Sequence, residues 1–320
     1  MKPIILFLCL CWFGLTGCTD PDPAPDTTEQ AATEEPEAVS LLGEPLYRQN
    51  FPPEQRAKLE ANLDTALTNY EQNPNDVENV IWLGRRQAYL WRYQEAIDTF
   101  SEGIAQFPDE PKLYRHRGHR YITVRNFDRA VADLQHAADL IEGTEDEIEP
   151  DGAPNPAGIP TSTLHTNIWY HLGLAHYLMG NYEDALAAYQ QCLAASTNDD
   201  MRVATLDWLY MTLHRLDRPE EAQTLLTSIH ADMELLESFA YHHRLLMYKG
   251  EIPPDSLLHA DPTADDRALQ LATQGYGVGN WYLANGDSAK AEAIFREVID
   301  GSYWPAFGYI AAESDLQRME

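Results

Sequence analysis

WYHLGLAHYLMG, residues 169–180, is followed after one asparagine by YEDALAAYQQCLAAS, residues 182–196. In both stretches apolar residues recur at intervals of three and four, which is the period of one face of an α-helix. Gly180 and Asn181 form a helix stop between them. The sequence therefore predicts two helices joined by a tight turn, and no strand-like alternation competes with this prediction.

The spacing of this helix pair recurs along the chain. Counting from Gly173, an alanine follows at offset 12, a large apolar residue at offset 16 and a further small or apolar residue at offset 19. Gly84, Gly118 and Gly279 begin the same series, and the first two of them are 34 residues apart. A glycine inside a helix costs about 1 kcal/mol relative to alanine. Its repetition in one register therefore predicts close contact between the two helices of a pair.

The pattern resembles the tetratricopeptide repeat. The resemblance covers residues 77–299, and it is clear in four units and degraded in two, around residues 210–229 and 237–258. It implies an all-α solenoid of stacked antiparallel helix pairs in a right-handed superhelix, with a concave groove lined by the first helices. It also implies binding rather than catalysis. The matching residues are Trp169, Leu172, Gly173, Tyr182, Ala185 and Tyr189, and in an earlier unit Leu83, Gly84, Tyr93, Ala96, Phe100 and Pro108.

The N-terminal residues predict export and lipidation. The apolar run PIILFLCLCWFG, residues 3–14, is too short to span a membrane as a mature helix. LTGC, residues 15–18, resembles the lipobox of bacterial lipoproteins, which implies removal of residues 1–17 and acyl chains on Cys18. The alternative is a secretory signal that is cleaved nearby without a lipid. Lipidation implies anchoring in the bacterial cell envelope, and we expect the outer membrane, at its periplasmic face or at the cell surface.

Composition divides the remainder of the chain. Residues 18–50 are rich in acid and proline and predict a disordered tether. Residues 143–165 are also acidic and proline-rich and predict a long loop. Because this loop lacks apolar anchors, we expect a short Gly/Ser turn to replace it with little loss of stability. The predicted order from residue 51 is a packing helix (51–76), two units (77–142), the loop, four units of which two are degenerate (166–300) and a capping helix (301–320).

The chain carries 51 acidic residues against 22 basic ones, yet YRHRGHRYITVRN, residues 114–126, is densely positive. We expect this segment to be the first helix of the second unit. One repeat length separates Arg85 from His119, Arg115 lies one turn before His119, and Lys112 lies a further turn back. These four residues predict a cationic patch in the groove for a carboxylate or a phosphate. The alternative is pairing with acids close in sequence, namely Asp98, Glu102, Asp128 and Asp133.

Three tyrosines fall on or near groove positions: Tyr89, Tyr170 and Tyr177. They would stack on a peptide side chain or a sugar, and the alternative is packing in the core. Nucleic acid is not favoured, because the rest of the protein repels phosphate. Zinc is not favoured either, because no third ligand accompanies His116 and His119 at a telling distance. No nucleophile elbow, phosphate-binding glycine loop or metalloprotease motif is present in the sequence, so we expect no enzyme activity and no cofactor.

Two functions are compatible with these patterns. The first is a lipid-anchored repeat protein of the cell envelope that binds a peptide segment of other envelope proteins, acidic or C-terminal, in its groove. The second is an outer-membrane lipoprotein that captures glycans or nutrients. Glycan capture requires exposed tryptophans in one plane, and repeat lipoproteins of that kind are usually much longer than this chain.

Overall fold

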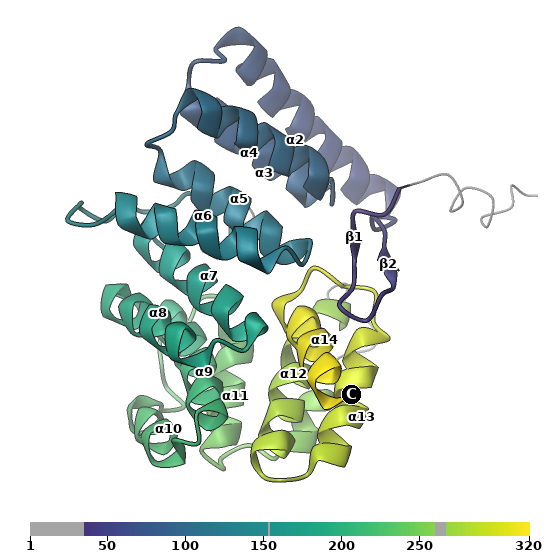
Figure 1. Ribbon diagram of the computed structural model, residues 1–320, viewed down its shortest axis with the longest axis vertical. Helices are drawn as coiled ribbons and strands as arrows, with labels where there is room; N and C mark the ends of the chain where they lie inside the picture. The colour runs from purple at the N-terminus through teal and green to yellow at the C-terminus, as the bar shows by residue number, and fades with distance from the viewer. Residues whose placement is uncertain (1–34, 153, 260–266) are drawn as a thin grey trace, which may run out of the picture. The chain divides into compact units, whose positions relative to one another are not determined.

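The computed structural model describes residues 35–152, 154–259 and 267–320 (Figure 1). The signal sequence, Cys18 and the tether up to residue 34 lie outside the described residues. The described part of the chain forms the thirteen α-helices α2 to α14, two short 3-10 helices and one two-stranded sheet. The predicted all-α repeat architecture is confirmed. None of the described helices is long and apolar enough to cross a membrane.

Six helix pairs follow one another between residues 77 and 299. The first helices contact one another in chain order and form a continuous inner layer, and each also packs on its own second helix. The pairs are α3 (Val77–Tyr89) with α4 (Tyr93–Gln106), α5 (Pro111–Thr123) with α6 (Phe127–Leu140), α7 (Leu164–Met179) with α8 (Tyr182–Ala195), α9 (Asp199–Arg215) with α10 (Pro219–Leu225) and the 3-10 helix η1 (Leu226–Ser228), α11 (Phe239–Tyr248) with the 3-10 helix η2 (Pro254–Leu258), and α12 (Arg267–Ala284) with α13 (Ser288–Ile299).

The repeated glycines allow the two helices of a pair to pack closely. A Cβ atom added at Gly84 would lie 2.5 Å from the ring of Phe100, the residue at offset 16. The alanine at offset 12 is fully buried in all four clear units. A large buried side chain on the second helix therefore requires the glycine on the first. The same contact joins Gly118 with Leu134, Gly173 with Tyr189 and Gly279 with Phe295.

Each pair turns at one residue with a left-handed backbone. This residue lies seven positions after the repeat glycine or the residue in its place, and the degraded units share it. Glycine adopts this backbone without steric cost, whereas another residue loses roughly 1–2 kcal/mol. The six residues are Trp91 (φ 57°), Arg125 (φ 64°), Gly180 (φ 84°), Asp217 (φ 56°), Gly250 (φ 84°) and Gly286 (φ 84°).

The prediction of a disordered tether is wrong for residues 36–50. The strands β1 (Ala38–Val39) and β2 (Pro45–Leu46) pair in an antiparallel hairpin. Glu37, at the start of the hairpin, is only 3 % exposed, and its carboxylate accepts a hydrogen bond from the backbone nitrogen of Gln94 at 3.0 Å. At least one acidic residue of this stretch, Glu37, therefore makes a specific buried contact and is not solvated.

The hairpin links the first helix pair to the end of the chain. The helix α14 (Phe307–Met319) packs on α12 and α13 and also contacts α7, while α2 (Pro53–Gln72) packs on α3. Trp304 Nε1, in the segment before α14, donates to the carbonyl of Tyr47 at 2.7 Å. Figure 1 shows the hairpin beside α14, far from it in sequence.

The expected loop leads into α7, and its isoleucines Ile148 and Ile159 are exposed, as the lack of apolar anchors predicts, but polar contacts hold the loop in place. Ile148 pairs with Thr163 in an isolated antiparallel bridge. Asn198 Nδ2 donates to the carbonyl of Thr161 at 2.7 Å. Glu149 is 7 % exposed. The loop is therefore held by polar contacts, which a search for apolar anchors does not detect.

Candidate ligand-binding cavities

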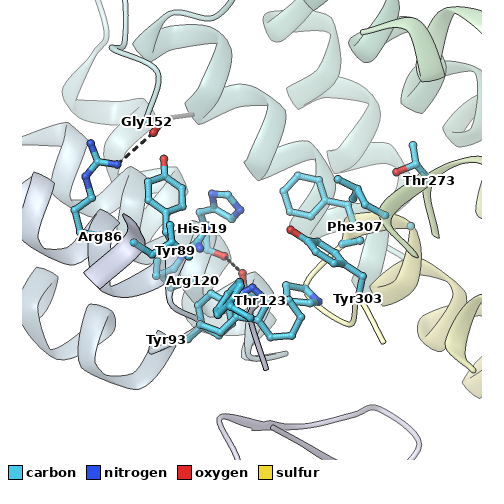
Figure 2. A pocket seen from close by; sticks show the side chains of 18 of the residues that line it. Arg86, Tyr89, Tyr93, His119, Arg120, Thr123, Gly152, Thr273, Tyr303 and Phe307 are labelled. Atoms are coloured by element: carbon cyan, nitrogen blue, oxygen red, sulfur yellow. Dashed lines mark hydrogen bonds between the residues drawn. The ribbon is translucent and has the colours of Figure 1, made fainter. Parts of the chain in front are cut away.

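A cavity of about 900 Å³, here called the main cavity, is lined chiefly by the first helices (Figure 2). Residues of α2 and of the segment leading into α14 complete its wall. Among the described residues, no aspartate or glutamate lines it, although the chain has 51 acids. Its basic side chains are Lys58, Arg86, His119, Arg120 and Arg244, and its aromatic ones include Tyr89, Tyr93, Trp208, Tyr241, Tyr303 and Phe307.

Arg120 differs from the other arginines of its helix, because it has no carboxylate partner within the part of the chain that the structure describes. Its guanidinium lies over the ring of Tyr93, 5.5 Å from the ring centroid. Burial lowers the pKa of Arg120 to about 10, and the charges of Arg115 and Arg85 act in the same direction. A bound anion would compensate this charge.

Two other arginines of the main cavity are held by neighbours. Arg86 Nη1 donates to the carbonyl of Gly152 at 3.3 Å, as Figure 2 shows. Arg244 forms a two-pronged ion pair with the buried carboxylate of Asp207, with Nε at 2.9 Å from Oδ1. The charge of the described wall that no described carboxylate neutralises therefore lies on Arg86, whose hydrogen bond is to a neutral carbonyl, on Arg120 and on the exposed Lys58.

A second cavity of about 190 Å³, here called the small cavity, shares wall residues with the main cavity. The structure brings four of the residues selected from the sequence to its wall: Arg85, Tyr89, Arg115 and His119. The guanidinium of Arg85 lies over the ring of Trp82 at 4.3 Å and has no acidic partner among the described residues. Lys112 is not part of this wall, because it pairs with Glu78 at 3.0 Å and with Glu147 at 3.2 Å.

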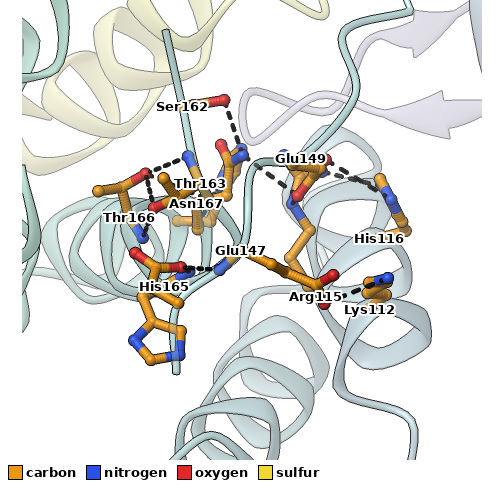
Figure 3. Close-up of polar contacts among 12 residues, drawn as sticks. Lys112, Arg115, His116, Glu147, Glu149, Ser162, Thr163, His165, Thr166 and Asn167 are labelled. Atoms are coloured by element: carbon orange, nitrogen blue, oxygen red, sulfur yellow. Dashed lines mark hydrogen bonds and ion pairs between the residues drawn. The ribbon is translucent and has the colours of Figure 1, made fainter. Parts of the chain in front are cut away.

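The carboxylate of Glu149 occupies one side of the small cavity (Figure 3). Its Oε2 lies 3.1 Å from Arg115 Nε, an ion-pair distance without hydrogen-bond geometry. It also accepts a hydrogen bond from Asn167 Nδ2 at 3.2 Å. Arg115 is only 8 % exposed. The prediction of Arg115 as an open groove residue is therefore corrected: the chain's own loop covers it.

Three histidines lie close to these arginines. Burial and the neighbouring arginine charges hold the pKa of His116, His119 and His171 well below the usual value. Arg115 Nη1 lies 3.0 Å from His116 Nδ1, which accepts this hydrogen bond in the neutral ring. The ring centroids of His119 and His171 lie 4.3 Å apart, with the two rings tilted by 42°. The described residues contain no group of three side chains placed to hold a metal ion.

Tyr170 and Tyr177 are core residues, so their assignment to the groove is wrong. Tyr170 is 6 % exposed, and its hydroxyl accepts a hydrogen bond from Trp208 Nε1 at 2.7 Å. Tyr177 is 1 % exposed, and its hydroxyl lies 2.8 Å from that of Tyr276. Both belong to the aromatic packing between first helices, which was the alternative interpretation of their spacing.

Most arginines of the positive segment, residues 114–126, form ion pairs within the chain. Arg117 forms a two-pronged pair with Asp133 at 2.7 and 2.8 Å, as the sequence-based alternative anticipated for that acid. Arg115 and Arg125 pair with acids of the loop and of α14, respectively. Arg120 alone among the four arginines of the segment lacks an acid in the described chain.

Sequence reasoning missed Arg86, Arg120 and most of the aromatic wall. Arg120 belongs to the positive segment that the sequence shows. What distinguishes it is that no carboxylate of the described chain pairs with it, and only the fold can reveal this. Tyr241 lies in a degraded unit, and Phe307 lies at the start of α14, so neither had a repeat position to mark it.

The family model of the tetratricopeptide repeat matches residues 166–196, which hold most of α7 and all of α8. The chain therefore contains a tetratricopeptide repeat at these residues. This tetratricopeptide-repeat protein is similar to a tetratricopeptide repeat protein from Parabacteroides merdae, with 16 % identity, a TM-score of 0.48, and coverage of 82 % of this chain and 94 % of the other.

Two further solved structures are similar to this tetratricopeptide-repeat protein. YrrB, described as a TPR protein with an unusual peptide-binding site, has 14 % identity and a TM-score of 0.43, and the match covers 74 % of this chain and 92 % of YrrB. MamA has 14 % identity and a TM-score of 0.42, and the match covers 64 % of this chain and 99 % of MamA.

Proposed function

We propose that this tetratricopeptide-repeat protein binds a peptide segment of a partner protein in the main cavity, with an acidic side chain or C-terminal carboxylate of the partner at Arg120. One observation carries the proposal: in a chain with a formal charge of −29, the described wall of this cavity has several basic groups and no carboxylate. A wall of one sign concentrates its field on an anionic ligand.

The chemistry of the wall supports a peptide. The planar guanidinium of arginine binds two oxygens of a carboxylate at once. The tyrosine and phenylalanine rings around Arg120 give apolar contact area with few rotatable bonds, as protein-binding surfaces use it. A volume of about 900 Å³ accommodates several side chains. The net charge of the chain repels an acidic partner at long range, so binding is local and of moderate affinity.

The glycan alternative has no comparable support. None of the six tryptophans in the described part of the chain is exposed. Trp208 borders the main cavity but is 1 % exposed and donates its indole hydrogen to Tyr170. A planar row of exposed tryptophans for a sugar is therefore not found among the described residues, and glycan capture is not our proposal.

We further propose that lipid on Cys18 anchors the protein in the bacterial envelope, so that its partners are envelope proteins. The motif LTGC at residues 15–18 after an apolar run supports this. The test is fractionation of cells that express Cys18→Ala. The variant should appear in the soluble fraction, and its retention in membranes after a salt wash would argue against the lipid.

The binding proposal is tested by photo-crosslinking in cells, with a benzophenone amino acid in place of Tyr303 in the cavity wall. The wild-type cavity should give a discrete crosslinked partner, and Arg86→Gln/Arg120→Gln should reduce that adduct at least about tenfold, as expected for loss of a desolvated charge contact. Arg129→Gln is the control, because Arg129 is exposed on α6 and does not line either cavity. Equal adducts from all three proteins would refute the proposal.

A further inference from the structure

The loop segment EIEPDG, residues 147–152, lies on the surface that the sequence marked as a ligand patch. Figure 3 shows Glu147 and Glu149 facing Lys112, Arg115 and His116 of α5, and the segment reaches α3 through Gly152. Three contacts follow one another along it. Glu147 pairs with Lys112 at 3.2 Å, and Glu149 pairs with Arg115 at 3.1 Å. The last contact is made by the carbonyl of Gly152, which accepts the hydrogen bond from Arg86 described above.

The segment is held by its carboxylates and not by apolar packing. Between the two glutamates, Ile148 is 64 % exposed. Glu149 is buried against Arg115 and His116, whereas the side chain of Glu147 is 52 % exposed. An acidic chain segment in a cationic groove is the arrangement that a bound acidic peptide would adopt, and here the segment belongs to the same chain.

The charge balance determines what can replace this segment. If the loop moved away alone, Arg115 would lose its ion pair with Glu149 together with the cover of the loop, and Asn167 would lose its hydrogen bond to the same carboxylate. A segment that supplies a carboxylate at the same place restores these contacts. Arg85 and Arg120 line the same small cavity and form no ion pair with a carboxylate of the described chain, although Asp151 also lies in its wall. The surface therefore selects an acidic replacement over a neutral one.

We propose that residues 147–152 are an internal ligand of the surface around Lys112, Arg115 and the small cavity, which adjoins the main cavity through Tyr89, His119 and Arg120, and that an acidic segment of the partner displaces it there. The inference rests on the proposed function and adds the chemistry of the partner: two carboxylates two residues apart, as in Glu147 and Glu149, that meet Lys112 and Arg115. Because the internal ligand is tethered, its effective concentration is in the millimolar range. A partner must compete with it, and its apparent affinity falls in proportion.

The test uses a fluorescent peptide of residues 145–152, EDEIEPDG, with blocked ends, and measures its binding to the full chain by anisotropy. The wild type should bind weakly. Glu147→Gln/Glu149→Gln should bind at least about tenfold more tightly, because the internal competitor has lost its charges. A second peptide with glutamine in place of Glu147 and Glu149 should bind neither protein, and adding Arg115→Gln to the double variant should abolish the gain.

The possible results of the peptide experiment distinguish the internal ligand from the proposed function. Equal affinity of the acidic peptide for wild type and double variant, with both folded by circular dichroism, would overturn the inference. If the double variant does not fold, Glu147→Gln replaces it, because that carboxylate is half exposed; a gain of about threefold supports the inference and no gain refutes it. Should the loop variants leave the Tyr303 adduct unchanged while Arg86→Gln/Arg120→Gln removes it, the internal ligand is refuted and the proposed function stands.

Discussion

Arg125 and Glu313 form a buried two-pronged ion pair across 188 positions of sequence, with Nε at 3.0 Å from Oε2 and Nη2 at 2.9 Å from Oε1. Their side chains are 3 % and 1 % exposed. Arg125 is the left-handed residue of the turn after α5, and Glu313 lies on α14. The pair therefore connects the second helix pair to the last helix and helps to offset the strain of that turn.

Breaking this pair from one side should destabilise the protein strongly. Arg125→Met leaves the Glu313 carboxylate buried without its partner, and we expect the free energy of unfolding to fall by about 3–5 kcal/mol. The double variant Arg125→Met/Glu313→Met should recover most of this loss, because no charge remains buried. Urea unfolding of the three proteins measures both effects, and a single variant within 1 kcal/mol of wild type would contradict the expectation.

The helix pairs could be predicted from sequence because their signals are local. The contact of Gly84 with Phe100 lies within one repeat, at a fixed offset, so the spacing alone reveals it. The link between Arg125 and Glu313 has no such signal, because it depends on how six units bring α14 back towards α5. Tyr170 was misplaced for a related reason. Helical spacing gives the direction in which a side chain leaves the helix axis, but the neighbouring first helix decides whether that direction faces the groove or the core.

The burial of individual acidic residues could not be predicted from composition. Glu37 and Glu149 lie in stretches whose composition indicates solvation, yet both are buried beside partners. Composition averages over a stretch, whereas burial is decided for each carboxylate by the path of the chain. For the same reason the sequence located the positive segment correctly but could not tell that Arg120 is the member without an acidic partner among the described residues.

Asp217→Gly should stabilise the protein. Asp217 is exposed and holds a left-handed backbone with φ 56°. Glycine removes a steric cost of roughly 1–2 kcal/mol but increases the entropy of the unfolded chain, so the net gain should be about 0.5–1 kcal/mol. Thermal and urea unfolding measure the change. Trp91→Gly is the informative contrast, because Trp91 has the same backbone but is 4 % exposed, and its loss should destabilise.

Replacing residues 144–162 with a short Gly/Ser linker should destabilise the protein, contrary to the expectation from sequence. The deletion removes the Glu149 partner of Arg115 and the loop hydrogen bonds, such as that of Asn198 to Thr161, so we expect a loss of about 2–3 kcal/mol in the free energy of unfolding. Arg115→Met in the deletion background should restore little of it, because without the loop the guanidinium is open to water. A deletion that unfolds at the wild-type urea concentration would show that the loop contributes no net stability.

Stability should fall as the pH is lowered below about 6.5. His116, His119 and His171 have lowered pKa values in the folded protein, so between the folded and unfolded pKa the unfolded chain binds more protons. Each histidine then contributes a loss of up to ~1.4 kcal/mol per pH unit. Burial raises the pKa of Asp207 to about 6, which acts in the opposite direction below that pH.

The measurement is the free energy of unfolding between pH 7.5 and 6.5, above the pKa of Asp207. His171→Leu should reduce the slope, but by less than a third, because the lowered pKa values of His176, His214 and His243 also contribute to it. A flat profile in the wild type would mean that these histidines are solvated and not held neutral by the fold.

Arg120→Met should increase stability and abolish partner binding together. Arg120 is charged in the folded protein with its pKa lowered to about 10, so at neutral pH its burial is an unrelieved cost that methionine removes while keeping the contact with Tyr93. Because the side chain is partly accessible, we expect a gain of roughly 1–2 kcal/mol and not the full value of the shift. Arg129→Met, on the exposed face of α6, should change stability by less than about 0.5 kcal/mol.

A residue that lowers stability but is needed for binding is expected in a functional site, so a gain of stability together with a loss of binding would identify Arg120 as a binding residue. If Arg120→Met lost stability and still gave the Tyr303 adduct, Arg120 would be a structural residue and the anionic ligand would have to lie elsewhere.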